Sequence, residues 1–143
     1  MKKLKEALTD LQCELVAERT RVNPQNISWL QYDILHQLEK QETILPSELS
    51  AILGISRTKL SKSLKSLKIL GYIQQIPNKS DGRELYTSIS TEGKDLLKKI
   101  SAGHQTLYES ALNSLSEEEQ LVFANLSIRV SERLRKERIK AYE

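Results

Sequence analysis

Two short helical patterns joined by three residues constrain the fold of this chain more than any other stretch of its sequence. The first pattern begins with a proline, which suits the first position of a helix, and stops before Gly54, which readily takes the left-handed conformation found just past helix ends. Ser56 can cap the second helix. Leu60, Leu64 and Leu67 then repeat at helical spacing. A pair of helices with so short a connection is typical of a helix-turn-helix.

The outward face of the second helix is polar and cationic. With the leucines inward, Thr58, Lys62 and Lys65 lie roughly opposite, and Ser61 lies on the flank. Residues 55–83 carry seven basic side chains and one acidic one, so the rest of the chain is net acidic within a total charge of +3. Such a localised charge favours a polyanionic partner, and the DNA major groove, about 12 Å wide, admits one helix.

A single β-hairpin pattern follows the helix-turn-helix. In "ELYTSI", Leu85, Thr87 and Ile89 share one side, as in a half-buried strand, whereas "YIQQIP" alternates less regularly and predicts a bulge or a twist. The polar run "NKSDGR" forms the tip, where Gly82 gives the turn backbone freedom. A hairpin directly after a helix-turn-helix predicts a winged helix.

Amphipathic patterns flank this unit on its N-terminal side. Leucines recur at helical spacing from Leu4 onward until the stop "VNP", which predicts a first helix of about 18 residues. Ser28 and Gln31 have the spacing of a capping box and predict the start of a second helix. The short "TIL" before the third helix is a candidate small strand.

On the C-terminal side, one long helical pattern is expected from Thr91 through Ala111. Ser116 and Glu119 form a second capping-box pattern and predict the start of a final helix. The predicted fold class is therefore mainly α with a small β-hairpin. At 143 residues, residues 1–143 are expected to form a single domain.

Other classes of protein and site have little support in the sequence. No apolar run approaches the ~20 residues that span a bilayer, and we expect a cytoplasmic protein. Neither His36 nor His104 has a second ligand at metal-binding spacing, so no metal or other cofactor is expected. Cys13 is more readily explained as a packing residue than as an oxidant-sensing thiol, since its immediate neighbour is Glu14. With no catalytic motif present, we expect no catalytic residues and no enzyme.

Two stretches resemble the MarR family of bacterial transcriptional regulators. "SELSAILGISRTKLSKSLKSLKILGYI" is similar to that family's helix-turn-helix, and "SDGRELYTSISTEGKDLL" is similar to its wing and the following helix. Asp81 and Arg83 stand at the positions of the D-x-R motif of the wing. Asn78 and Ser80 stand where many members carry a further Asp and Arg.

The resemblance implies a homodimer that grips a pseudo-palindromic site on double-stranded DNA and acts as a repressor by excluding polymerase. It implies a winged-helix lobe over residues 28–90, and dimerisation helices over residues 1–22 and 91–143. It also implies a small-molecule effector, since many members respond to one.

The residues expected to contact DNA are Arg57, Thr58, Ser61, Lys62, Lys65, Lys79 and Arg83. In the wing, Asp81 is expected to orient Arg83, and Gly82 to form the turn. Trp29, Tyr32 and Tyr86 are candidates to line an effector pocket, with ordinary core packing as the alternative explanation.

An alternative function is a winged-helix module that binds another protein and never meets DNA. That function predicts an exposed apolar patch on the recognition face.

Overall fold

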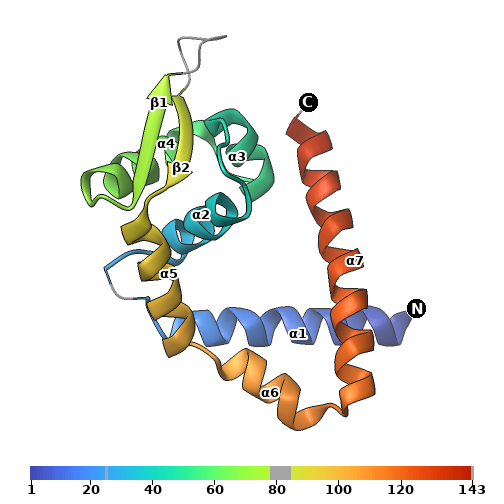
Figure 1. The fold of residues 1–143 in the computed structure, drawn as a ribbon. Coiled ribbons are helices and arrows are strands. Elements are labelled where there is room, and N and C mark those ends of the chain that lie inside the picture. Colours follow the sequence, from blue (N-terminus) through green and yellow to red (C-terminus); the bar gives the residue numbers. More distant parts are fainter. Residues whose placement is uncertain (25, 78–84, 143) are drawn as a thin grey trace.

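The computed structural model describes residues 1–24, 26–77 and 85–142, and it has the predicted class of fold: helices with one antiparallel hairpin (Figure 1). The elements in chain order are α1 (Lys2–Arg21), α2 (Trp29–Lys40), α3 (Pro46–Leu53), α4 (Arg57–Ile69), β1 (Ile73–Pro77), β2 (Leu85–Ile89), α5 (Thr91–Gly103), α6 (Thr106–Ser114) and α7 (Glu117–Tyr142). Among the described residues, no helix combines the length and the apolar character needed to cross a membrane.

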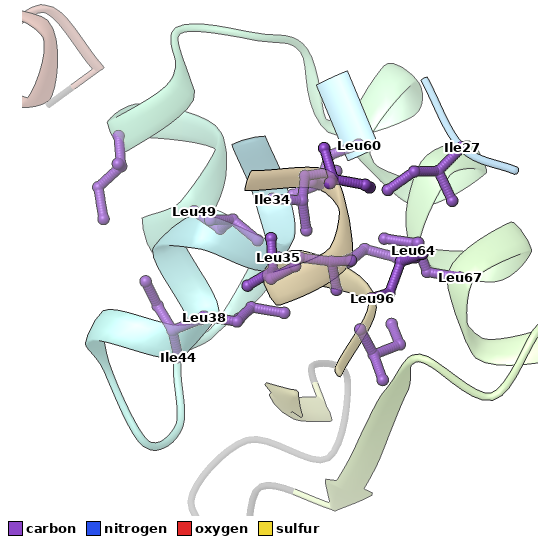
Figure 2. Close-up of a cluster of buried hydrophobic side chains, with 14 residues drawn as sticks. Ile27, Ile34, Leu35, Leu38, Ile44, Leu49, Leu60, Leu64, Leu67 and Leu96 are labelled. Carbon is purple, nitrogen blue, oxygen red and sulfur yellow. The ribbon is translucent and has the colours of Figure 1, made fainter. Parts of the chain in front are cut away.

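The hydrophobic core lies in a lobe formed by α2, α3, α4, α5 and the hairpin (Figure 2). Leu35 of α2 lies at its centre and is fully buried. Around it, α3 contributes Leu49, α4 contributes Leu60, and α5 contributes Leu96. Because α4 is held by buried leucines from one side only, its other side remains on the surface.

Local capping signals place the helix starts. The Ser28 side chain accepts a hydrogen bond from the backbone N–H of Gln31, and the Gln31 side chain accepts one from the N–H of Ser28, which confirms the predicted capping box. Ser116 and Glu119 make the same reciprocal pair before α7. Gly54 ends α3 with a φ of 68°, a left-handed conformation that costs glycine little.

The hairpin keeps a one-to-one register between β1 and β2, from the pair Ile73–Ile89 to the pair Pro77–Leu85. No bulge interrupts the five described pairs, so the expected irregularity does not take that form. The predicted small strand before α3 is a single antiparallel bridge between Ile44 and Thr87. This bridge ties the segment before α3 to the hairpin.

The long helix predicted from Thr91 through Ala111 is instead two helices. The chain leaves helical geometry at His104, whose φ and ψ are −131° and 60°, and α6 starts at Thr106. Gly103 precedes the break, and glycine is among the least helix-favouring residues. The repeat of apolar residues continues through the break, so periodicity alone could not locate it.

Three helices, α1, α6 and α7, extend from the lobe, and none of their described side chains is buried. They nevertheless carry a series of large apolar residues that are exposed in the single chain. The most regular of these are Leu4, Leu8, Leu11 and Leu15 on α1, and Leu126, Val130 and Leu134 on α7. We call these three helices the arms.

Gly93 lies where α5 crosses the base of the hairpin. A Cβ atom on Gly93 would collide with the carbonyl oxygen of Tyr72 and would lie 2.7 Å from Cγ1 of Ile89. Ser90, just before α5, holds the same junction, because its hydroxyl donates to the Gly71 carbonyl at 2.6 Å and accepts from the Gly93 N–H at 3.1 Å. The absence of a side chain at Gly93 therefore allows α5 to approach the hairpin.

The variant Gly93→Ala should lower the free energy of unfolding by about 1–3 kcal/mol. The junction must shift to make room for the methyl group, and the energetic cost of this shift exceeds the gain in helix propensity. The matched control is Gly103→Ala, where a methyl group would meet no described atom within 4 Å. Urea unfolding followed by circular dichroism measures both. Equal stability of the two variants would contradict the close approach at Gly93.

Candidate nucleic-acid interface

The turn between α3 and α4 is fixed by backbone hydrogen bonds. The N–H groups of Gly54 and Ile55 both donate to the carbonyl of Ser50, at 2.8 and 3.1 Å. Ser56 then caps α4, and its hydroxyl accepts from the N–H of Lys59 at 3.1 Å. The turn therefore sets the direction in which α4 leaves α3.

The recognition face of α4 comprises Arg57, Thr58, Ser61, Lys62 and Lys65, and all five side chains are exposed. On the opposite side of the helix, the three leucines are buried. No acidic residue occurs in α4, so nothing within the helix offsets its positive charge. The five residues predicted on this helix therefore lie together on one exposed cationic surface.

The recognition face offers no apolar surface for another protein. Between Arg57 and Ser66, every exposed side chain is hydroxylated or basic. Exposed apolar side chains begin only at the C-terminal end of α4, with Ile69 and Leu70. The observation that would favour a protein-binding module is therefore missing from the recognition face.

The predicted wing residues Lys79, Asp81, Gly82 and Arg83 lie outside the described residues. Strands β1 and β2, which flank that segment, are in place and pair with each other. The roles of these four residues therefore stay predictions.

A hollow of about 700 Å³ lies between the arms and the lobe. It is lined by residues of α1, α2 and α5, and by the start of α6, and its walls include Val16, Trp29, Tyr32, Ile100 and Leu107. Trp29 and Tyr32, two of the three predicted pocket residues, thus lie together. Tyr86 does not line the hollow: it lies on β2, where it pairs with Ile76 of β1.

Polar contacts hold the walls of this hollow in place. Arg19 forms a bidentate ion pair with Asp33, with both N–O distances at 2.8 Å. The hydrogen bond to Asp33 raises the pKa of Arg19 above its already high value, so the guanidinium stays charged. The Tyr32 hydroxyl lies 3.2 Å from Oγ of Ser101 and links α2 to α5.

Trp29 joins the end of α1 to the lobe. Its indole N–H donates to the carbonyl oxygens of Arg19 and Val22, at 2.7 and 2.9 Å, and so satisfies carbonyls at the end of α1. The Arg19 guanidinium lies 4.9 Å from the indole centroid, within cation–π range. His104 meets the indole edge-on at a centroid distance of 5.4 Å.

Sequence reasoning missed Arg19, Ser101 and His104 as residues of this hollow. Arg19 lies in α1, whereas Ser101 and His104 lie at the C-terminal end of α5, and the two parts of the chain meet only through the packing of α1, α2 and α5. The non-helical position at His104 could not be predicted from the apolar repeat.

Other candidate chemistry finds no support in the described residues. Cys13 is exposed on α1, where it does not fill a buried interface within the single chain. No three His, Cys, Asp or Glu side chains gather as metal ligands in residues 1–24, 26–77 and 85–142. His36 stacks on Tyr32 with ring centroids 6.3 Å apart.

Comparison with known proteins points to the same family that the sequence resembles. A sequence model described as MarR family matches residues 25–84. The transcriptional repressor MprA of Escherichia coli strain K12 is 32% identical over 117 residues, which cover 78% of this chain and 66% of that protein. The aligned region thus spans just under two thirds of that relative's length.

Solved structures share the fold across most of the chain. The structure of Streptococcus pneumoniae FabT in complex with DNA superposes with a TM-score of 0.68 at 20% identity, covering 94% of this chain and 97% of FabT. Bordetella bronchiseptica BpsR, whose DNA binding is regulated by 6-hydroxynicotinic acid, superposes with a TM-score of 0.70 at 15% identity, covering 90% of this chain and 98% of BpsR.

Proposed function

The chain belongs to the MarR family, and on that premise we propose that it is a sequence-specific transcriptional regulator that binds double-stranded DNA as a homodimer and represses transcription. The observation that carries this proposal is the exposed cationic face of α4, held in place by buried leucines on the opposite side. A helix of this kind fits the major groove, where Thr58 and Ser61 approach base edges, and Lys62 and Lys65 reach bases or phosphates. Arg57 lies in the first turn of the same helix, near the DNA backbone.

The wing belongs to the same proposal. Arg83, oriented by Asp81, contacts the minor groove or the backbone, and Lys79 contacts phosphate. The recognition helices of two protomers then enter successive major grooves, about 34 Å apart along the DNA. In the cell, the protein acts in the cytoplasm and excludes polymerase from a promoter.

The arms supply the partner surface that the homodimer requires. Leu8 and Leu15 of α1 and Val130 of α7 are between 37% and 51% exposed in the single chain, although their spacing is that of a buried stripe. A second copy of the chain brings a matching apolar surface, and an isologous contact buries both at once. We assign the arms to this contact.

The hollow between arms and lobe is the proposed effector site. A ligand there touches α1, α2, α5 and α6, so it acts on the joint that orients the lobe relative to the arms. Trp29, Tyr32 and His104 offer aromatic surface to a planar compound. The first probe is 6-hydroxynicotinic acid, because BpsR shares the fold and responds to it.

The double variant Lys62→Glu/Lys65→Glu should lose DNA binding by about a hundredfold or more, since repulsion replaces attraction at two phosphate-facing positions. The control Lys98→Glu/Lys99→Glu makes the same change of charge on exposed residues of α5. Fluorescence anisotropy on a duplex from the promoter of the protein's own gene measures both, with binding of the wild type also followed across salt concentrations. Equal losses of DNA affinity in the two variants, or a wild-type affinity insensitive to salt, would contradict the proposal that α4 binds DNA.

The variant Val130→Glu should halve the mass of the protein in solution, because a charge in the apolar stripe of α7 cannot be buried without a partner. Light scattering after size exclusion measures the mass. The control is Arg129→Glu, which places the same side chain about 100° round the helix. A monomeric wild type, or a Val130→Glu variant that keeps the mass of the wild type, would contradict the dimer.

Saturable quenching of Trp29 fluorescence should accompany binding of 6-hydroxynicotinic acid, because Trp29 is the only tryptophan of the chain and lines the hollow. Leu107→Ala, in the wall of the hollow, should weaken binding about fivefold or more by removing apolar contact. Leu112→Ala, on the same helix but outside the lining, should leave it unchanged. If both variants weakened binding by the same factor, the compound would bind outside the hollow.

A further inference from the structure

The C-terminal end of α7 returns to the lobe and contacts the turn of the helix-turn-helix. Figure 1 shows the end of α7 beside α3, far from the start of the same helix. Nε of Arg138 donates to the carbonyl oxygen of Ile52 at 2.9 Å, and the Tyr142 hydroxyl donates to the carbonyl oxygen of Ile55 at 2.6 Å. Ile139 packs against the core cluster between them.

The two acceptors lie on either side of the turn that aims α4. Ile52 is in the last turn of α3, where carbonyls have no partner within the helix and where a cation is favoured by the helix dipole. Ile55 directly precedes Ser56, the N-cap of α4. Arg138 and Tyr142 therefore hold both sides of the connection from the same face of α7.

The fit at this contact is close. A Cβ atom on Gly54 would lie 3.2 Å from Cδ of Arg138, so the arginine stem covers the glycine of the turn. A larger residue at position 54 would meet both an unfavourable φ and this side chain. The end of α7 is thus packed closely against the turn between α3 and α4.

The preceding turns of α7 have a different character. Leu126, Val130 and Leu134 are about half exposed, and they belong to the stripe assigned to the second copy of the chain. α7 has 26 residues, and at about 1.5 Å per residue it is roughly 39 Å long. One continuous helix therefore connects the proposed dimer contact to the turn before α4.

We propose that Arg138 and Tyr142 are positioning residues that lock α4 to α7, so that α7 transmits the geometry of the dimer to the spacing of the two recognition helices. This inference rests on the proposed function, since spacing matters only to a dimer that reads two half-sites. Neither residue touches DNA. Their effect is on which half-site spacings the dimer accepts.

A purely stabilising role makes a different prediction. Loss of stability alone would weaken binding to all duplexes by the same factor and leave the preferred spacing unchanged. Loss of the lock lets each α4 move relative to α7, and it therefore weakens discrimination between spacings. Spacing preference is the readout that separates the two roles.

The experiment compares the wild type with the double variant Arg138→Ala/Tyr142→Phe. Duplexes are selected from a random pool by the wild type, and the best one is resynthesised with one base pair inserted or deleted at its centre, which moves the half-sites by about 3.4 Å. The wild type should lose about tenfold or more in affinity for the altered duplexes, whereas the double variant should lose only about two- to threefold. The variant Arg138→Lys keeps a cationic donor near Ile52, so it should retain most of the wild-type discrimination between duplexes of different half-site spacing.

The matched control is Arg133→Ala, which removes an arginine of the same helix whose partner is Glu137, at 3.0 Å, rather than the turn. It should keep the spacing preference of the wild type. A double variant that discriminates between spacings as the wild type does would overturn the inference while leaving the proposed function intact. A wild type that selects no duplex would overturn both.

A second measurement reads the geometry without DNA. A spin label on Ser66→Cys in a Cys13→Ser background reports the distance between the two α4 helices of a dimer, because Ser66 is exposed on α4 and lies outside the recognition face. The distance distribution should be narrow for the wild type and for Arg133→Ala, and broader for the double variant. A distribution unchanged by loss of both hydrogen bonds would count against the lock.

Discussion

Burial of one side of α4 is the constraint on which the proposed function depends. Leu60 and Leu67 are fully inaccessible, and they fix the rotation of the helix about its own axis. A helix that turned by one residue would expose a leucine and bury a lysine, and burial of an unpaired charge is strongly unfavourable. The polar face is thus directed outward by what the opposite face must bury.

The features of the fold that could be predicted from the sequence are those set by interactions between residues close together in the chain. Ser28, Gly54 and Ser56 act on backbone groups within four residues, so their roles are legible in the sequence and the structure confirms them. The break at His104 was missed because the apolar repeat runs through it. The shared exposure of the five residues on α4 could be predicted, since one helical period places them all, and their contact with DNA stays a prediction.

The hollow depends on contacts that no local rule encodes. Arg19 meets Asp33 across 14 residues, and Tyr32 meets Ser101 across 69. Trp29, Tyr32 and Tyr86 are all candidates for the pocket because they are aromatic. Trp29 and Tyr32 line the hollow, whereas Tyr86 lies in the hairpin. Residue type suggested the pocket, but only packing could tell which of the three aromatic residues line it.

The arms have a thermodynamic consequence. None of their described side chains is fully buried in a single chain, so in the proposed dimer most of their apolar surface is removed from water when two chains meet. For the proposed dimer, folding of the arms and association are then coupled, and the midpoint of thermal unfolding is expected to rise with protein concentration. By the law of mass action, occupancy of DNA by such a dimer varies with the square of the monomer concentration while monomers predominate. A small change in expression would therefore produce a proportionally larger change in occupancy.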